Sequence, residues 1–228
     1  MLTGIMLLYV GATLGINGIW LIGQARAAAT SADLVPDTVS AALGEESRSQ
    51  DAGGQTVLRH RRPAPPRVDP PEKHFTFIQP KEIAVINFFT AGVGVVVATV
   101  FAVQGALQNN LTSVATAAYI MLFGFTYMFV GLNQLMNAGN RAFGWYCFFV
   151  AVTAIPTGIF TLRGAHGNAA SLWLGFNWLI WGCLWFAFFL LLTMGRPIMR
   201  PVGWATVAVA VATCWAFGYA LLQGVVAL

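Results

Sequence analysis

Six long apolar runs restrict this chain more than any other feature of its sequence. Each run approaches the roughly 20 apolar residues that an α-helix needs to cross a bilayer. The runs are Leu2–Gly23, Ile83–Val103, Ser113–Gln134, Gly144–Leu162, Ser171–Met194 and Gly203–Gly224. They lack the apolar–polar alternation of strands in a membrane barrel. With 57% hydrophobic and 9% charged residues, the chain is predicted to be an all-α integral membrane protein with six transmembrane helices.

The predicted organisation has three parts. Residues 1–23 form the first transmembrane helix, residues 24–80 a disordered cytoplasmic linker, and residues 81–228 the other five helices. The linker is expected because alanine, proline, glycine, serine and charged residues replace the apolar residues after Gly23. Its proline-rich part favours extended chain over helix. A basic patch at 59–71 has the charge to bind anionic lipid headgroups, but a solvated linker is the favoured interpretation.

The charged residues are distributed unevenly along the chain. All eight acidic residues lie between Asp33 and Glu82. Ion-coupled transporters and proton pumps usually hold a carboxylate within the membrane, so the sequence argues against both classes. Of the 12 lysines and arginines, all except Arg163 lie in the first, third and fifth loops. Positive loops are predominantly cytoplasmic, which predicts that both termini lie outside.

No group of residues indicates catalysis. The three histidines lie in loops, away from any buried acid or nucleophile. Cys147, Cys183 and Cys214 fall within predicted helices and have no metal-site or redox spacing. We interpret them as small packing residues. We therefore predict that the chain is not an enzyme and that it needs no metal, cofactor or nucleic-acid partner.

A stripe of tryptophans marks the fifth apolar run. Trp178, Trp181 and Trp185 are spaced i, i+3, i+7, so a helix places the three indoles on one face. From spacing alone, a packing seam or a lipid-facing ridge is as well supported as a pore wall. Gly182 thins the helix within this stripe, and the neighbouring runs carry asparagine and threonine but no charge. These two features favour the pore wall.

Short motifs are present in five of the runs, the fifth included. They are Leu7-Leu8-Tyr9-Val10-Gly11 with Asn17-Gly18, Asn87-Phe88-Phe89, Leu122-Phe123-Gly124-Phe125-Thr126-Tyr127, Trp145-Tyr146, and Trp181-Gly182 with Leu184-Trp185. In this order they resemble the AmiS/UreI family of urea channels and short-chain amide transporters. The resemblance covers nearly the whole chain outside residues 24–80 and the short external connections.

The resemblance implies a homohexameric ring in a bacterial inner membrane, with a solute path through each six-helix subunit. It also implies which side chains narrow that path: Phe123, Tyr127, Trp178, Trp181 and Trp185, joined by Leu7, Val10 and Leu14 of the first helix. As an isolated i, i+4 pair, Phe123 and Tyr127 would more often be core residues than a gate. Polar contacts to a solute, or hydrogen bonds between helices, are expected from Asn17, Asn87 and Asn133. The interhelical role is favoured for these three.

Three departures separate this chain from the acid-gated urea channels. The second connection, residues 104–112, is short and uncharged, and His166 is the only histidine expected outside. Val209 stands where those channels carry a glutamate, and Leu174 stands where they carry a further tryptophan. These differences favour the amide branch and argue against acid gating.

The predicted function is a passive channel for urea or short-chain aliphatic amides. A planar neutral amide has apolar faces for aromatic walls and a polar edge for hydroxyls, amides or carbonyls. An unpaired ion would lose its hydration in such a neck at high cost. Two alternatives are a channel for another small neutral solute such as ammonia, and a non-transporting scaffold whose aromatic stripe is a subunit interface.

Overall fold

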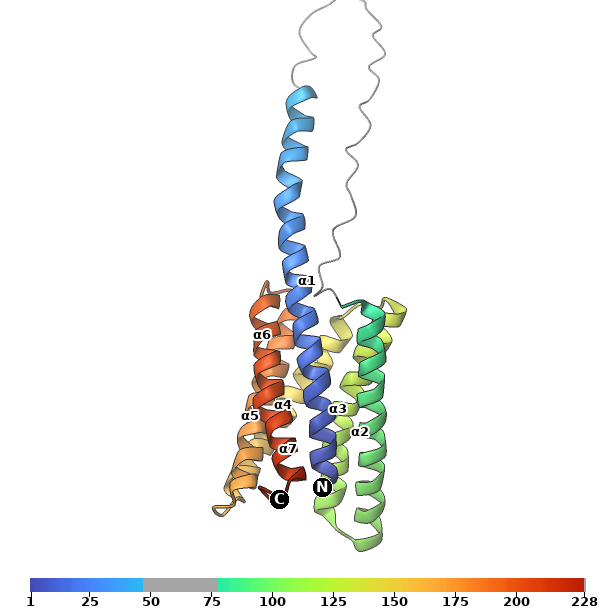
Figure 1. The fold of residues 1–228 in the computed structure, drawn as a ribbon, viewed down its shortest axis with the longest axis vertical. Helices are drawn as coiled ribbons and strands as arrows, with labels where there is room; N and C mark the ends of the chain where they lie inside the picture. Colours follow the sequence, from blue (N-terminus) through green and yellow to red (C-terminus); the bar gives the residue numbers. More distant parts are fainter. Residues whose placement is uncertain (47–77, 228) are drawn as a thin grey trace, which may run out of the picture. The chain divides into compact units, whose positions relative to one another are not determined.

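A computed structural model describes the fold of residues 1–46 and 78–227 (Figure 1). The helices are α1 (Leu2–Glu46), α2 (Pro80–Gln108), α3 (Leu111–Met136), α4 (Arg141–Arg163), α5 (Ala169–Leu192), α6 (Met199–Val209), a π-helical segment (Ala210–Trp215) and α7 (Ala216–Leu222). The last three form one continuous span, and six spans are long and apolar enough to cross a membrane. The predicted all-α, six-span fold is confirmed.

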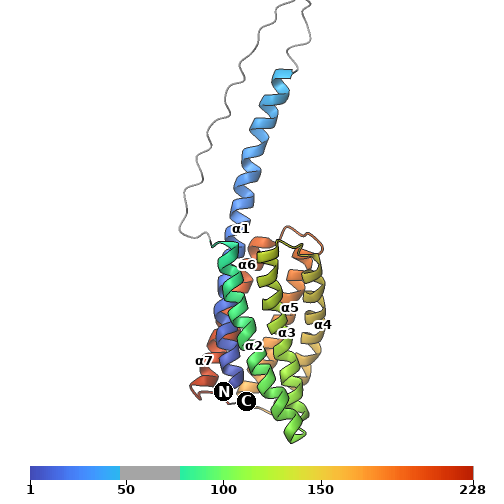
Figure 2. The same cartoon turned by 90° about the vertical axis from the view of Figure 1, so that its right-hand side faces the viewer.

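The chain divides into two units, residues 1–22 with 78–228 and residues 23–77. The first unit is a helical bundle, in which Met1 and the end of α7 lie at the same end (Figures 1 and 2). An even number of crossings requires this arrangement. We call this end the terminal end of the bundle.

The first helix is longer than predicted. It was expected to end at Gly23, but α1 continues to Glu46. Four of the six residues in 24–29 are alanine, the residue with the highest helix propensity, and this explains why the helix does not stop at the compositional change. The rest of the predicted linker, residues 47–77 with the basic patch at 59–71, lies outside the described residues.

Asparagines form the tight connection between α2 and α3 and cap the start of α5. Asn109 ends α2 in the left-handed conformation, with φ of 47°, and Asn110 begins the next helix one residue later. The Asn110 side chain accepts a hydrogen bond from the Ser113 N–H at 3.2 Å. Asn168 caps α5 in the same way, accepting from the Ser171 N–H at 2.8 Å. Such caps satisfy N–H groups that the first helical turn leaves unpaired.

Close backbone contact joins α1 to the last span, α6 to α7, as Figure 1 shows. A Cβ atom added at Gly11 would lie 2.8 Å from the Trp215 backbone nitrogen, and one added at Gly18 would lie 2.9 Å from the Gly203 carbonyl oxygen. Glycine is needed at both positions because the opposing atoms are backbone. Small residues at helix contacts let transmembrane helices approach closely.

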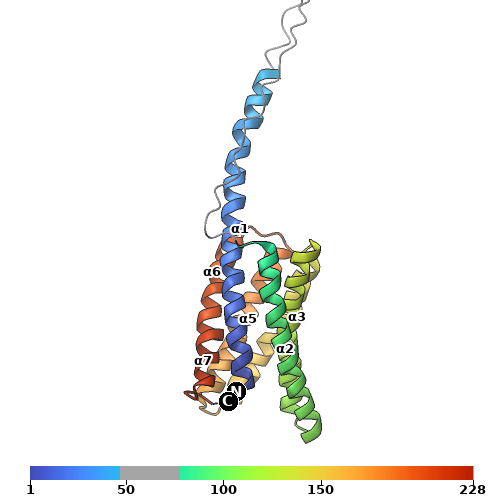
Figure 3. The same ribbon diagram turned by 45° about the vertical axis from the view of Figure 1, so that its right-hand side comes forward.

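The other helices pack mainly in two pairs, α2 with α3 and α4 with α5, which lie side by side in Figures 2 and 3. Glycines again set the spacing. A Cβ at Gly94 of α2 would lie 3.3 Å from the Gly124 Cα of α3, and one at Gly158 of α4 would lie 3.0 Å from the Gly175 carbonyl oxygen of α5. These contacts leave α1, α3 and α5 to face one another around the interior.

Candidate functional site

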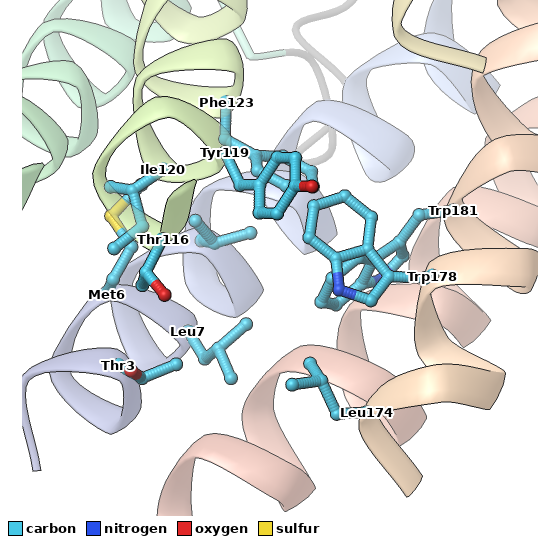
Figure 4. Close-up of a pocket in the computed structure, with 11 residues that line it drawn as sticks. Thr3, Met6, Leu7, Thr116, Tyr119, Ile120, Phe123, Leu174, Trp178 and Trp181 are labelled. Carbon is cyan, nitrogen blue, oxygen red and sulfur yellow. The ribbon is translucent and has the colours of Figure 1, made fainter. Parts of the chain in front are cut away.

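A cavity of about 100 Å³ lies among α1, α3 and α5 (Figure 4). Its lining residues are Thr3, Met6, Leu7 and Val10 of α1, Thr116, Tyr119, Ile120 and Phe123 of α3, and Leu174, Trp178 and Trp181 of α5. None of these side chains is charged. A water molecule occupies roughly 30 Å³ of liquid, so the cavity has room for one small organic solute.

Helical periodicity explains why these side chains all face the cavity. On each helix the lining residues are adjacent or lie three, four or seven positions apart, so each helix contributes a single face. The cavity extends from Thr3, in the first turn of α1, to Trp181 near the middle of α5. It therefore occupies the half of the bundle nearer the terminal end.

An aromatic cluster forms the inner part of the cavity wall. Phe123 of α3 lies against all three tryptophans of the stripe, with ring centroids 5.6 Å from Trp178, 5.2 Å from Trp181 and 6.2 Å from Trp185. Trp178 and Trp181 meet edge to face at 5.3 Å. In Figure 4 the ring of Tyr119 faces Trp178, and their centroids are 5.2 Å apart.

The three-helix arrangement separates the predicted constriction residues into two groups. Five of them line the cavity: Leu7, Val10, Phe123, Trp178 and Trp181. The other three, Leu14, Tyr127 and Trp185, each follow an innermost lining residue of the same helix by four positions. They are 6%, 2% and 4% exposed and belong to one core cluster. We call these three residues the inner layer, which is a packed layer one helical turn beyond the cavity.

One polar group in the inner layer is unpaired. The Tyr127 hydroxyl is buried and has no hydrogen-bond partner within the described part of the chain. Burying a hydroxyl without a partner costs about 1–3 kcal/mol, so such a group calls for an explanation.

Six lining residues were not predicted as site residues: Thr3, Met6, Thr116, Tyr119, Ile120 and Leu174. Tyr119 and Thr116 lie four and seven residues before Phe123, so extending the predicted face of that helix by two turns would have found them. Thr3 lies four residues before Leu7 and would have followed in the same way. These three residues supply the hydroxyl groups of an otherwise apolar wall.

The three predicted asparagines lie outside the cavity lining. Asn17 and Asn87 join α1 to α2 through two reciprocal hydrogen bonds of 3.1 and 2.9 Å between their side-chain amides. One turn away, the hydroxyls of Thr13 and Thr90 are 2.6 Å apart. Asn133 donates to the Asn140 side chain at 2.9 Å. Asn17 and Asn87 therefore bond two helices to each other, whereas Asn133 bonds to the N-cap residue of α4.

Replacing Asn87 with alanine is expected to destabilise the bundle without changing solute selectivity. Asn87 is fully buried, and its loss leaves the Asn17 amide unpaired. Measured polar pairs in membrane bundles suggest a cost of about 0.6–1.7 kcal/mol. Thermal unfolding in detergent of Asn87→Ala, Asn17→Ala and the double variant measures the coupling. Strictly additive effects would contradict a structural role for the pair.

Comparison with known proteins identifies the family. Residues 74–225 match the AmiS/UreI family transporter. The chain therefore belongs to the AmiS/UreI family, and it is a multi-pass membrane protein.

Relatives in this family carry two kinds of name. The chain is 32% identical over 145 residues to a transporter protein called AmiS2 in Rhodococcus erythropolis, covering 63% of this chain and 68% of the relative. It is 32% identical over 148 residues to an amidate substrates transporter protein of Mycolicibacterium smegmatis, covering 64% and 67%. It is 28% identical over 162 residues to the acid-activated urea channel of Helicobacter pylori, covering 61% and 83%.

Solved structures share the fold. The crystal structure of the Helicobacter pylori urea channel matches with a TM-score of 0.68 at 24% identity, over 100% of both chains. The cryoEM structure of that channel in a closed state matches with a TM-score of 0.67 at 24% identity, over 96% of this chain and 97% of the other. The agreement extends through the helices that enclose the cavity.

Proposed function

We propose that this protein is a passive channel for small neutral amides, either urea or, as the favoured class, short-chain aliphatic amides. The observation that carries the proposal is the uncharged cavity, which combines apolar and aromatic walls with three hydroxyl-bearing residues. One relative named as an amidate substrates transporter protein and another named as an acid-activated urea channel support this substrate class. The protein is then a conduit and not an enzyme.

The wall chemistry suits a planar amide. The flat faces of the solute can lie against Phe123 and Trp178, while its carbonyl and N–H groups meet the hydroxyls of Tyr119 and Thr116. Farther in, the unpaired Tyr127 hydroxyl offers one more hydrogen bond. An ion would find no opposite charge in this lining, so its desolvation would be uncompensated. The path therefore selects neutral solutes.

We further propose that the cavity is the external vestibule and that six subunits form a ring in a bacterial inner membrane. Arg141 begins α4, Arg196 lies in the loop after α5, and Arg200 lies in the first turn of α6. All three are at the end of the bundle opposite the terminal end, so the positive-inside bias places the terminal end outside. Large apolar side chains remain exposed on each subunit, available to lipid or neighbouring subunits. Native mass spectrometry measures the ring size, and labelling of an added N-terminal cysteine measures the orientation.

Acetamide or urea entry is expected at both neutral and acidic pH. The turn between α2 and α3 is short and uncharged, and the last span has Val209 where the acid-gated urea channels carry a glutamate. Neither position can therefore respond to protonation. Stopped-flow light scattering on proteoliposomes without an ion gradient measures entry of acetamide, urea and glycerol. We expect amide and urea rates several-fold above those of empty vesicles and little change with pH.

Two results would contradict this proposal. Entry equal to that of empty vesicles for every solute would favour a membrane scaffold. Entry that appears only in acid would show gating by protonation.

A further inference from the structure

One hydrogen bond fixes the central tryptophan of the aromatic cluster to the last span. The Trp181 Nε1–H donates to the Thr213 hydroxyl oxygen at 2.8 Å, and the two residues are 4% and 3% exposed. The Thr213 hydroxyl donates its own hydrogen to the Val209 carbonyl at 2.7 Å. An indole N–H can only donate, and a hydroxyl whose hydrogen is engaged can only accept. The direction of both bonds is therefore determined.

A second bond from α5 reaches the same threonine. Asn177, which precedes Trp181 by one helical turn, donates from Nδ2 to the Thr213 carbonyl at 2.9 Å. Asn177 is 1% exposed and is not a cavity-lining residue. Both the backbone and the side chain of Thr213 are thus bound by α5, so the Thr213 hydroxyl is held in place against the indole.

The backbone around Thr213 is also unusual. It belongs to the π-helical segment Ala210–Trp215, where the Ala216 N–H bonds to the Val211 carbonyl five residues back. Such segments are rare and frequently occur at functional sites. A π turn holds more residues than an α turn and so re-aims the side chains within it. This observation is independent of the hydrogen bonds and concerns the same residue.

Trp181 lies where a small rotation would alter the cavity. Its ring meets Phe123 edge to face at a centroid distance of 5.2 Å and an interplanar angle of 78°, and meets Trp178 at 5.3 Å and 75°. All three side chains line the cavity. An indole released from Thr213 would turn to find another partner for its buried N–H, and the edge-to-face contacts would change with it.

We propose that Thr213 is a positioning residue for solute selection: its hydroxyl holds the Trp181 indole in the orientation that limits the size of the admitted solute. The inference rests on the proposed channel function. Thr213 acts through Trp181 and is not among the residues that line the cavity. The alternative is that the bond only satisfies a buried indole and has no effect on selection.

The test compares three variants in proteoliposomes. Thr213→Val removes the hydroxyl at nearly constant volume, and Thr213→Ser restores it. The matched control is Thr206→Val, because Thr206 is 0% exposed in the same span but donates to Val202 within its own helix. The readout is the ratio of acetamide to butyramide entry. We expect Thr213→Val to lower this ratio roughly threefold or more, because the free energy of one neutral hydrogen bond corresponds to about that factor. Thr213→Ser and Thr206→Val should change the ratio little.

Trp181→Phe provides a second test, because it removes the donor instead of the acceptor. In that background Thr213→Val should lower the ratio no further. Indole ¹⁵N NMR of the full-length protein gives a readout independent of transport. The Trp181 signal, assigned by its loss in Trp181→Phe, should shift in Thr213→Val and not in Thr206→Val.

The outcomes separate the inference from the proposed function. If wild-type vesicles admit acetamide but the ratio is unchanged in Thr213→Val, the positioning role is wrong. The same conclusion follows if Thr213→Val lowers the ratio equally in the Trp181→Phe background. Absence of acetamide entry in wild-type vesicles overturns the channel function, and the selection role with it.

Discussion

Replacing Trp181 with alanine is expected to weaken size selection roughly tenfold or more, because even methylene-sized changes in an apolar pocket shift discrimination by such amounts. Trp181 lines the cavity, contacts Phe123 and Trp178, and adjoins the inner layer. Its truncation removes the central ring of the aromatic cluster. Glycerol and longer amides should then enter faster relative to acetamide. Trp185→Ala should act in the same direction, since it opens the inner layer.

Trp173 provides the matched control on the same helix. It lies off the stripe, packs against Phe217 at a centroid distance of 4.9 Å, and does not line the cavity. Trp173→Ala removes the same number of atoms but should change relative entry rates much less. Stopped-flow rates for acetamide, butyramide and glycerol, normalised to the amount of folded protein, make the comparison. Equal effects of the three truncations would refute the pore-wall assignment.

Replacing Gly11 with alanine is expected to destabilise the bundle by about 1–3 kcal/mol, the usual range for overpacking a close contact. The added Cβ would lie 2.8 Å from the Trp215 backbone nitrogen and 3.1 Å from its Cα. Neither atom can turn aside as a side-chain end can, so α1 and the last span must separate. This contact adjoins the π-helical segment that holds Thr213, so the aromatic cluster should also loosen.

Gly15 is the control for this substitution. It lies one turn farther along α1, and a Cβ there would come no closer than 3.7 Å to its nearest neighbour, the Ala210 Cβ. Gly15→Ala should be neutral or slightly stabilising, because alanine is favoured over glycine in a helix by roughly 0.5–1 kcal/mol. Thermal unfolding in detergent compares the two variants. A melting temperature equal to wild type in Gly11→Ala would show that the close contact is not needed.

Much of the fold followed from local chemistry. A hydrophobic run must be long enough to cross the bilayer, and every backbone group in it must be satisfied internally. For this reason the six runs predicted six helices, and the tryptophan spacing predicted that the three indoles share one face of α5. The boundary after Gly23 was less predictable because alanine suits both a helix and the small-residue composition of a linker. α1 continues past Gly23 because alanine has a high helix propensity, and the alanine content alone did not distinguish a helix from a linker.

The site was only partly predictable, since periodicity identifies a face but not what opposes it. Spacing alone explained the stripe of Trp178, Trp181 and Trp185 as well by a packing seam or a lipid-facing ridge as by a pore wall. The structure places Trp178 and Trp181 in the cavity wall and Trp185 in the packed inner layer. The asparagines were open to two roles for the same reason, and the Asn17–Asn87 pairing supports one of them.

The sequence by itself determined the number of spans, which residues of a helix share a face, and the absence of acidic residues after Glu82. These properties depend on residues a few positions apart, which a helix brings together whatever surrounds it. Only the tertiary structure decided which faces meet. It set Thr213 against Trp181 and Gly11 against Trp215, residues from different spans. Such pairings depend on how closely whole helices can approach, and no local periodicity in the chain records that distance.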